Sequence, residues 1–527
     1  MGGDRLGDDR PNAADRAGHH VRQSLHRSIT GRRGQRMTAR DNQQTAEKRP
    51  NIVFIITDQQ RVDTIAATGH PWMETPNLDR LVLEGTYFSN MYVTAPSCSP
   101  SRASLFSGTY PHTNGVFRND ETWSYCWVGE LAKAGYHCVN VGKMHTYPVE
   151  APFGFHERHV TENKDRSDPT VPFYLDNWDK AFWARGLTKP DTQTYKHRQD
   201  YRSSLGAFVW DLPEDLHSDN FVPAMACMWL DRWDGDKPFF LQVGIPGPHP
   251  PYDPVQRWFE RYLAKDDLPE AIRQDIPDLI EPVRKLKKKH EDSQYDAVIH
   301  IPDPTAEQLH RQRAAYFANV SMIDDQVGNI IDALERRGAL QDTIIIFTSD
   351  HGDCLNDHGL SQKWSMYDQS VKVPAIIWCP DRIGEGGTVS DLVSLMDLGP
   401  TVLELAGIEP PEFMEAQSLW GYVEGRDVPK RDAVFSEQAR DMIVQASEFQ
   451  TMIRTDRWKL VHYVDYDTGL LFDMQADPRE VNNLWDEAEH EMTKQRLIWR
   501  ILRWRVESAL KTQSYHRLAR STEPVPS

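Results

Sequence analysis

The sequence lacks long apolar runs, an excess of basic residues and a regular spacing of cysteines. No apolar run approaches the roughly 18 residues that a membrane-spanning helix needs. Lys and Arg number 60 against 78 Asp and Glu, so the net charge is −18 over 527 residues. Because nucleic-acid phosphates favour basic surfaces, we do not expect a nucleic-acid partner. Because no apolar run is long enough to span a bilayer, we do not expect a membrane partner either.

Cysteine is scarce and scattered. The six cysteines include no Cys-x-x-Cys pair, which argues against a disulfide framework or a zinc ribbon. Residues 1–48 are poor in apolar side chains and are predicted to be a disordered tail, as are residues 516–527. No apolar stretch follows the basic residues of the first segment, so it does not resemble a secretory signal. We therefore expect a cytoplasmic location with reduced thiols.

Four short apolar, β-branched runs each end at ionisable or amide side chains. The runs cover residues 51–57, 136–142, 239–245 and 343–349. The polar residues that follow them are Asp58, Gln59, Lys143, His145, His249, Asp350 and His351. Apolar residues recur at helical spacing over 316–334, just before the last run. Strands that alternate with helices predict an α/β fold with a large, mainly parallel sheet flanked by helices. Ligands gather at the carboxyl ends of such strands, so one shared site is expected.

The pattern changes towards the C-terminus. Short strands are predicted within residues 449–464 and 470–474, and a long amphipathic helix follows. We expect a catalytic domain over 49–415 and a smaller α+β subdomain over 416–515. The segment 279–304, with its basic run, is predicted to be an exposed insertion.

The stretch from Pro96 to Gly108 reads PSCSPSRASLFSG. Ser99 suits a helix N-cap and Pro100 suits the first turn, so the helix N-terminus would face Cys98. Backbone N–H groups and the charge of Arg102 would hold an anion there. The alternative is a buried cysteine before an ordinary capped helix.

Residues 98–102 resemble the C-x-P-S-R signature of the type I sulfatases, a family of the alkaline-phosphatase superfamily. Further family-like elements occur in order along residues 50–515. They are TPNLD at 75–79, GKMH at 142–145, PHP at 248–250, DHG at 350–352, Lys363, RTDRWKLVHY at 454–463 and LFDMQADPREVNNL at 471–484. The resemblance implies an alkaline-phosphatase-like fold and hydrolysis of a sulfate monoester to an alcohol and inorganic sulfate.

The resemblance also implies two cofactors. A formylglycine-generating enzyme would oxidise Cys98 to formylglycine, and one divalent metal would bind nearby. The implied metal ligands are Asp58, Gln59, the modified Cys98, Asp350 and His351. Oxygen-rich ligand sets favour Ca²⁺, Mg²⁺ or Mn²⁺ over zinc. Gln59 and His351 depart from the family's Asp-Asp and Asp-Asn pairs, which leaves the identity of the metal open. Ca²⁺ is the first expectation and Mn²⁺ the second.

The catalytic roles follow from the same resemblance. The hydrated formylglycine would attack sulfur, with Arg102 and the metal stabilising its ionised hydroxyl. Lys143 and Lys363 would hold the sulfate oxygens. His249 would protonate the leaving oxygen, and His145 would accept a proton from the second hydroxyl.

Several alternatives stay open. Phosphonate monoester and phosphodiester hydrolases of the superfamily also carry Asp-Gln and Asp-His pairs, although Lys143 and His145 favour a sulfatase. An inactive sulfate- or glycan-binding homologue is the third hypothesis. The GKMH element is shared with choline sulfatases, and aryl, choline and carbohydrate sulfates all remain candidate substrates, as does a homo-oligomeric assembly. Five tryptophans would form either a ligand platform or, as we favour, part of the core: Trp178, Trp183, Trp210, Trp229 and Trp233.

Overall fold

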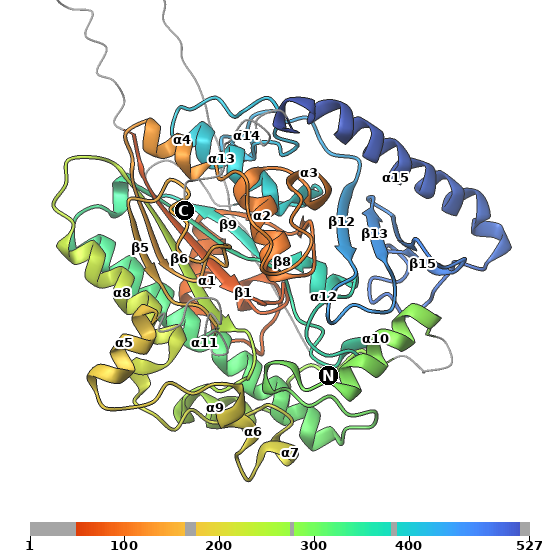
Figure 1. Cartoon of the computed structure of the whole chain (residues 1–527), viewed down its shortest axis with the longest axis horizontal. Helices are drawn as coiled ribbons and strands as arrows, with labels where there is room; N and C mark the ends of the chain where they lie inside the picture. Colours follow the sequence, from red (N-terminus) through yellow and green to blue (C-terminus); the bar gives the residue numbers. More distant parts are fainter. Residues whose placement is uncertain (1–48, 164–174, 274–278, 381–386, 517–527) are drawn as a thin grey trace, which may run out of the picture. The chain divides into compact units, whose positions relative to one another are not determined.

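The computed structural model describes residues 49–163, 175–273, 279–380 and 387–516. The predicted tail over residues 1–48 and nearly all of that over 516–527 lie outside the described residues. From Arg49 onward the chain forms one compact unit. The unit contains a large sheet between helices, with a second sheet near the C-terminal helix (Figure 1).

The large sheet has eight strands and is mainly parallel, as predicted. Their order is β10 (Gly387–Val389), β2 (Thr86–Phe88), β9 (Ala375–Trp378), β7 (Thr343–Ser349), β1 (Asn51–Asp58), β6 (Phe239–Pro248), β4 (His137–Gly142) and β5 (Glu157–Val160). β1 pairs in parallel with both β6 and β7, and β4 pairs in parallel with β6 and β5. β9 runs antiparallel to β7 and β2. The four strands expected from the sequence are therefore the adjacent strands β7, β1, β6 and β4.

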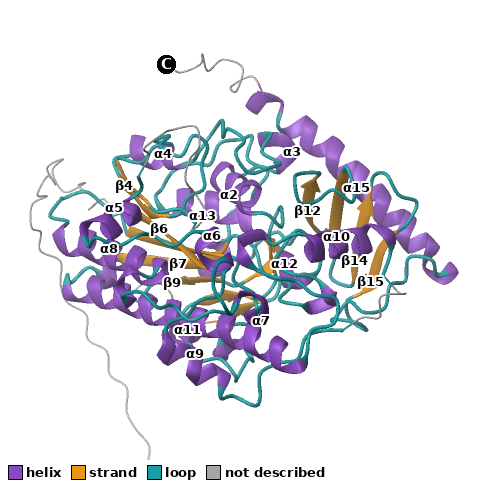
Figure 2. Cartoon of the chain, turned by 60° about the horizontal axis from the view of Figure 1, so that its bottom comes forward, coloured by secondary structure: helices purple, strands orange, loops and turns teal. Residues whose placement is uncertain are grey.

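Helices cover both faces of this sheet (Figure 2). Alternate residues of a strand point to opposite faces, and in β1 both sets are apolar and buried. Ile52, Phe54 and Ile56 pack with α2 (Cys98–Ser107), α4 (Val128–Lys133) and α13 (Leu398–Leu405). Val53 and Ile55 pack with α1 (Pro76–Glu84), α8 (Ser218–Arg232) and α11 (Ala306–Arg336). The continuous apolar runs of the sequence reflect burial on two sides.

Shorter elements surround this core. A small sheet contains β11 (Val393–Ser394), β3 (Met91–Tyr92) and β8 (Lys372–Val373). The remaining α-helices before the second sheet are α3 (Pro111–Asn114), α5 (Asn177–Ala184), α6 (Thr192–Lys196), α7 (Tyr201–Ser204), α9 (Gln256–Leu263), α10 (Glu281–Asp292), α12 (Asp368–Val371) and α14 (Trp420–Val423). Trp178 and Trp210 are buried in one apolar cluster, which confirms core packing for these two. Trp229 stacks on Trp233, and Trp183 is exposed.

The C-terminal region is a smaller α+β unit, as predicted. Its antiparallel sheet runs β12 (Val434–Ala439), β13 (Phe449–Arg454), β14 (Trp458–Tyr463) and β15 (Gly469–Asp473). The helix α15 (Glu491–Lys511) packs Leu497, Ile501 and Trp504 against it. The buried Lys459 of β14 forms ion pairs with Asp368 of α12 and with Glu480. The domain boundary at residues 415/416 stays a prediction.

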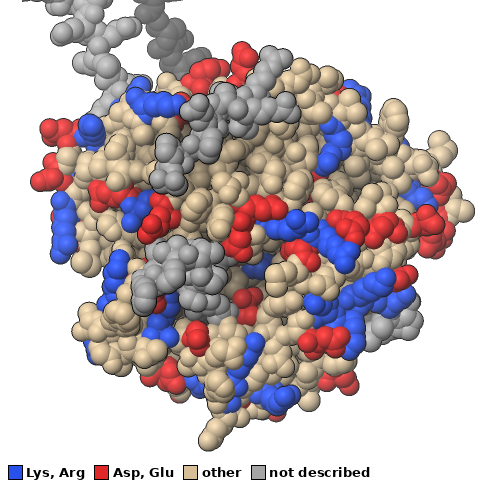
Figure 3. All heavy atoms as spheres, viewed as in Figure 1, with Lys and Arg blue, Asp and Glu red and all other residues tan. Residues whose placement is uncertain are grey.

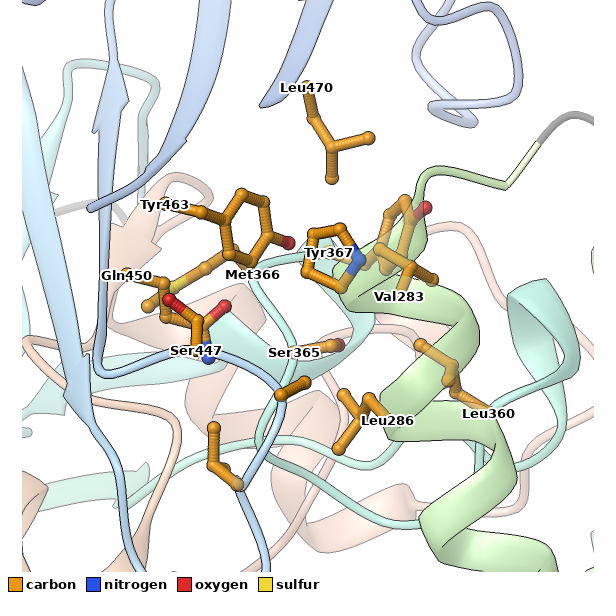
Figure 4. Close-up of a pocket in the computed structure, with 13 residues that line it drawn as sticks. Val283, Leu286, Leu360, Ser365, Met366, Tyr367, Ser447, Gln450, Tyr463 and Leu470 are labelled. Carbon is orange, nitrogen blue, oxygen red and sulfur yellow. The ribbon is translucent and has the colours of Figure 1, made fainter. Parts of the chain in front are cut away.

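The prediction of an exposed insertion over 279–304 is wrong for both halves, because residues 297–300 are buried as well. Leu279, Val283 and Leu286 are buried in the main core. In α10 the apolar side faces a narrow crevice that the C-terminal strands close from the other side, with Tyr463 and Leu470 opposite (Figure 4). Within the basic run, Lys285 and Lys288 lie on the exposed side of this helix, whereas Lys287 is buried and donates to the Gly359 carbonyl oxygen at 3.0 Å.

Charged side chains of both signs are mixed on the surface of the described residues (Figure 3). Lys and Arg are interspersed with Asp and Glu over the face in Figure 3. Among the described residues, no helix has both the length and the apolar character needed to cross a bilayer. All six cysteines are free thiols.

Candidate active site

The sheet order brings the ends of four strands together. Asp58 ends β1, and Asp350 and His351 follow its neighbour β7. On the other side of β1, His249 follows β6, and Lys143 follows β4. Because these four strands are parallel and adjacent, the residues after them lie along one edge of the sheet.

Cys98 lies at the centre of this group. α2 begins at Cys98 with Ser97 at its N-cap, so the predicted N-cap at Ser99 is wrong and Cys98 belongs to the first turn. The Cys98 Sγ atom is 3.2 Å from His351 Nε2 and 3.6 Å from Asp58 Oδ1. One ligand atom from each of Asp58, Cys98, Asp350 and His351 lies within 4.8 Å of the others, and all four residues are buried.

Three cationic side chains surround the cluster. Lys363 Nζ lies 3.0 Å from Cys98 Sγ, and Lys143 pairs with Asp58. Arg102 Nε donates to Asp350 Oδ2 at 2.7 Å, and its Nη1 donates to the Lys143 carbonyl oxygen at 3.0 Å. Arg102 Nη2 is buried and has no hydrogen-bond partner among the described residues. A buried donor without a partner is costly, so this N–H group is suited to an anionic oxygen of a ligand.

The electrostatic environment of Cys98 differs from that of the core thiols. Burial raises the pKa of Cys126, Cys138 and Cys354 to about 12 each. Burial and the Asp58 carboxylate act in the same direction on Cys98, but Lys143, Lys363 and His351 outweigh them and lower its pKa. Burial also opposes ionisation of Asp58, yet the adjacent Lys143 holds its pKa well below the usual range. The site is therefore built to hold negative charge.

The hydrogen bonds of His249 fix its tautomer. Its Nδ1 is 2.9 Å from the Pro250 carbonyl oxygen, which can only accept, so Nδ1 carries the proton. Burial and the Lys363 cation hold the His249 pKa well below its usual value, so the ring is neutral and Nε2 carries a lone pair that can accept a hydrogen bond. Asn163 Nδ2 lies 3.3 Å from that Nε2, while Asn163 Oδ1 accepts from Lys143 Nζ at 2.8 Å. Asn163 thus joins two predicted catalytic residues.

Gln59 and His145 both adopt backbone φ values in the left-handed region, 73° and 63°. Gln59 Oε1 accepts from Lys363 Nζ at 2.9 Å, and its Nε2 donates to Asp353 at 2.7 Å. The side chain of His145 is buried, and its backbone N–H donates to Glu162 at 3.1 Å. Non-glycine residues at positive φ cluster at functional sites because the surrounding structure must hold them there.

Sequence analysis missed two residues of this site. Asp353 accepts hydrogen bonds from Gln59 and, at 2.7 Å, from the Tyr252 hydroxyl. It follows the Asp350–Gly352 motif directly, so its position was a usable signal. Asn163 follows β5. Its place in the site could have been predicted only from the general rule that polar residues gather after the ends of parallel strands. The side-chain oxygen of Asn119 accepts from the Ser99 N–H at 3.3 Å.

Chemically, the arrangement combines a reactive side chain, two carboxylates, an imidazole and three cations in a buried site. Oxygen and nitrogen atoms at this spacing are suited to a divalent cation. The ammonium and guanidinium groups can bind a tetrahedral oxyanion from several sides. His249 can accept or deliver a proton at Nε2.

Comparison with known proteins gives a consistent assignment. A sequence model described as Sulfatase matches residues 50–408, and one described as N-sulphoglucosamine sulphohydrolase, C-terminal, matches residues 356–507. An arylsulfatase of Clostridium perfringens is 32% identical over 457 residues, covering 84% of this chain and 92% of that protein. A choline-sulfatase of Rhizobium meliloti is 30% identical over 450 residues, covering 83% of this chain and 82% of that protein.

The fold comparison agrees. The crystal structure of a phosphonate monoester hydrolase of Agrobacterium radiobacter superposes with a TM-score of 0.73 at 25% identity, covering 87% of this chain and 96% of the other. The structure therefore confirms the predicted alkaline-phosphatase-like fold. Since the Sulfatase model spans more than half of the sequence, the chain belongs to the sulfatase family and is a sulfuric ester hydrolase.

Proposed function

We propose that the protein cleaves a sulfate monoester at Cys98, after conversion of this residue to formylglycine, with a divalent cation bound beside it. One observation carries the proposal: Cys98 Sγ lies against Asp58 and His351 at the strand ends, inside a ring formed by Arg102, Lys143 and Lys363. Formylglycine in the sulfatase family supplies an aldehyde whose hydrate bears hydroxyl groups on one carbon. The thiol of unmodified cysteine offers no such pair.

The residues present fit a divalent cation. Asp58 and Asp350 are fully buried carboxylates, which need positive charge close by. With Gln59 and His351 they offer three oxygen-bearing side chains and one imidazole. When bound, the cation would offset the negative charge of the reacting oxygens. This oxygen-rich set favours Ca²⁺, then Mn²⁺, with Mg²⁺ as a further candidate.

The remaining roles belong to side chains around the ring. Lys143 and Lys363 approach the cluster from different strand-end loops and would bind sulfate oxygens. Arg102 orients Asp350 and leaves Nη2 for an anionic oxygen. His249 would first take up a proton from solvent at Nε2 and then pass it to the leaving alcohol, because its Nδ1 proton is committed to the Pro250 carbonyl oxygen. His145 would accept a proton during product release.

The first test is the mass of the proteolytic peptide that carries Cys98, from protein produced with and without a formylglycine-generating enzyme. We expect the aldehyde mass only after co-production, together with sulfate release from a test ester. A thiol mass in both preparations, with turnover retained, would overturn the formylglycine proposal. The same enzyme is the maturation partner that we propose for the cell.

The substrate class follows from a panel of sulfate esters. The names of the similar proteins point to aryl sulfates and choline sulfate, and carbohydrate sulfates complete the panel. Sulfate release measured for each ester at equal concentration would rank them by kcat/KM. The ester with the highest value identifies the class of leaving alcohol.

A second candidate activity is phosphonate monoester hydrolysis. The observation that favours it is the TM-score of 0.73 to the phosphonate monoester hydrolase. Lys143, which is buried beside Asp58, and His145 favour the sulfatase instead. Phenyl phosphonate esters therefore belong in the same panel, and a higher kcat/KM for them than for every sulfate would reverse the order of the two activities.

A further inference from the structure

Within the described part of the chain, the outer side of α15 carries an exposed apolar stripe. Of the eleven large apolar side chains that are exposed among the described residues, five lie on this one helix. They are Met492, Trp499, Leu502, Val506 and Leu510, with exposed fractions between 52% and 87%. The other six are scattered over separate elements, as isolated surface residues usually are. A stripe of this kind marks an interaction surface.

The stripe is distinct from the side of α15 that packs on the protein. Leu497, Ile501 and Trp504 are buried against the C-terminal sheet. The exposed residues follow one another at intervals of seven, three, four and four, so they lie on a second side of the helix. Figures 1 and 2 both show α15 at the margin of the unit, with the second sheet on its inner side. A surface helix that packs on the protein through one side alone carries polar residues on its outer side, whereas the outer side of α15 is apolar.

The charges on α15 favour a protein partner over an anionic lipid surface. The helix carries six basic residues, of which four form ion pairs within the chain. These pairs are Lys494–Glu491, Arg500–Asp432, Arg503–Glu507 and Arg505–Glu437. Their positive charge is largely neutralised, whereas a helix bound to an anionic membrane keeps its basic side free. Exposed Trp beside Arg is the composition of a protein interface.

The exposed charges are complementary to those of a second copy. If two α15 helices lie antiparallel about a two-fold axis near residues 501 and 502, Arg496 of each copy faces Glu507 of the other. Trp499 then lies between Leu502 and Val506 of the partner. Arg496 forms no ion pair with another described residue, and Glu507 pairs only along its own helix with Arg503. The helix is about 30 Å long, so the whole stripe can be covered.

We propose that α15 is the interface of a homodimer in which two copies pack these helices antiparallel about a two-fold axis. In such an interface each copy contributes the same patch, so a single substitution acts twice. The apolar stripe supplies the binding free energy, and the Arg496–Glu507 pairs set the register. This interface is independent of the active-site chemistry, so a test of one does not depend on the outcome for the other.

The first experiment is sedimentation velocity of the full chain between about 0.1 and 100 μM. We expect a dimer whose dissociation constant rises about thirtyfold or more in Trp499→Glu, because a central Trp typically contributes at least 2 kcal/mol. Leu83→Glu is the matched control, since Leu83 is equally exposed but lies on α1. It should leave the dissociation constant unchanged. A wild-type chain that stays monomeric over this range, including one that binds vesicles of anionic phospholipid through Trp499, would overturn the proposal.

A mixing experiment tests the two-fold geometry without touching the apolar residues. Arg496→Glu places like charges opposite each other in its own homodimer, and so does Glu507→Arg. A mixture of the two variants restores both ion pairs in the heterodimer. We expect each variant alone to dimerise about tenfold more weakly than the wild type, and the mixture to recover. Variants that weaken dimerisation equally alone and mixed would exclude the antiparallel pairing.

Discussion

The side-chain amide nitrogen of Asn163 lies 3.3 Å from Nε2 of His249. Because Nδ1 of this ring donates to Pro250, Nε2 is the ring nitrogen that can exchange a proton with a ligand. The other end of the same amide accepts from Lys143. An amide oxygen can only accept and an amide nitrogen can only donate, so the two contacts fix the orientation of Asn163. One short side chain therefore sets the distance between the proposed proton donor and a proposed sulfate-binding group.

Substitution of Asn163 tests this link. In Asn163→Ala we expect kcat to fall about three- to tenfold, the value of one net hydrogen bond. The loss should be larger for alkyl sulfates than for nitrophenyl sulfate, because only poor leaving groups need a proton from His249. Steady-state rates with both esters measure the difference, with Asn90→Ala, a surface amide replacement, as control. Equal losses for both esters would mean that Asn163 acts through Lys143 alone.

Cys98 should be the only thiol that turnover requires. We expect Cys98→Ala to abolish multiple turnover, since alanine cannot be converted to an aldehyde. Cys227→Ala should retain full activity, because Cys227 is half-buried on α8 and its sulfur contacts the Asn329 carbonyl oxygen. Sulfate release over many equivalents of enzyme checks both variants. Residual multiple turnover in Cys98→Ala would place the nucleophile elsewhere.

Removal of the divalent cation should lower both activity and stability. A ligand that binds only the folded chain adds about 2.7 kcal/mol to the free energy of unfolding at one hundred times its dissociation constant. We expect a lower Tm and loss of turnover in excess chelator, with recovery on adding back one of Ca²⁺, Mn²⁺ or Mg²⁺. The ion that restores both at the lowest concentration identifies the metal. A melting curve and rate that chelator leaves unchanged would contradict a bound cation.

The buried carboxyl of Asp324 predicts a pH-dependent stability. Burial raises its pKa to about 7, although the backbone N–H groups of Leu78 and Asn77 hydrogen-bond the carboxylate. The pKa in the unfolded chain is about 3.9. Between these values the folded chain binds the proton and the unfolded chain does not. The contribution of Asp324 is therefore fully present below about pH 4 and is lost as the pH rises to 7, by at most about 4 kcal/mol.

Melting curves at pH 5 and pH 7.5 test this sign. The Tm of the wild type should fall more between the two values than the Tm of Asp324→Asn, whose side chain does not titrate. Asp332→Asn, an exposed change on the same helix, should behave like the wild type. Identical pH dependence in the wild type and Asp324→Asn would show that Asp324 is ionised already at pH 5.

Much of the fold could be read from local patterns. The four apolar runs are strands because β-branched side chains favour the extended backbone, and their polar ends were already visible in the chain. The signature from Cys98 to Arg102 predicted a helix that begins just after the reactive cysteine. Its first residue was misplaced because Ser97, not Ser99, is the N-cap. Helix boundaries depend on which of several capping residues the surrounding structure selects.

The sequence by itself thus determined the family, the mainly parallel sheet and the set of strand-end residues, because periodicity and short motifs are local properties. Only the tertiary structure decided that Asn163 meets His249, that Gln59 meets Asp353, and that α10 is half-buried. It also decided which side of α15 is exposed. These contacts join residues tens to hundreds of positions apart, and they depend on the order of β7, β1, β6 and β4, which hydrophobic periodicity does not encode.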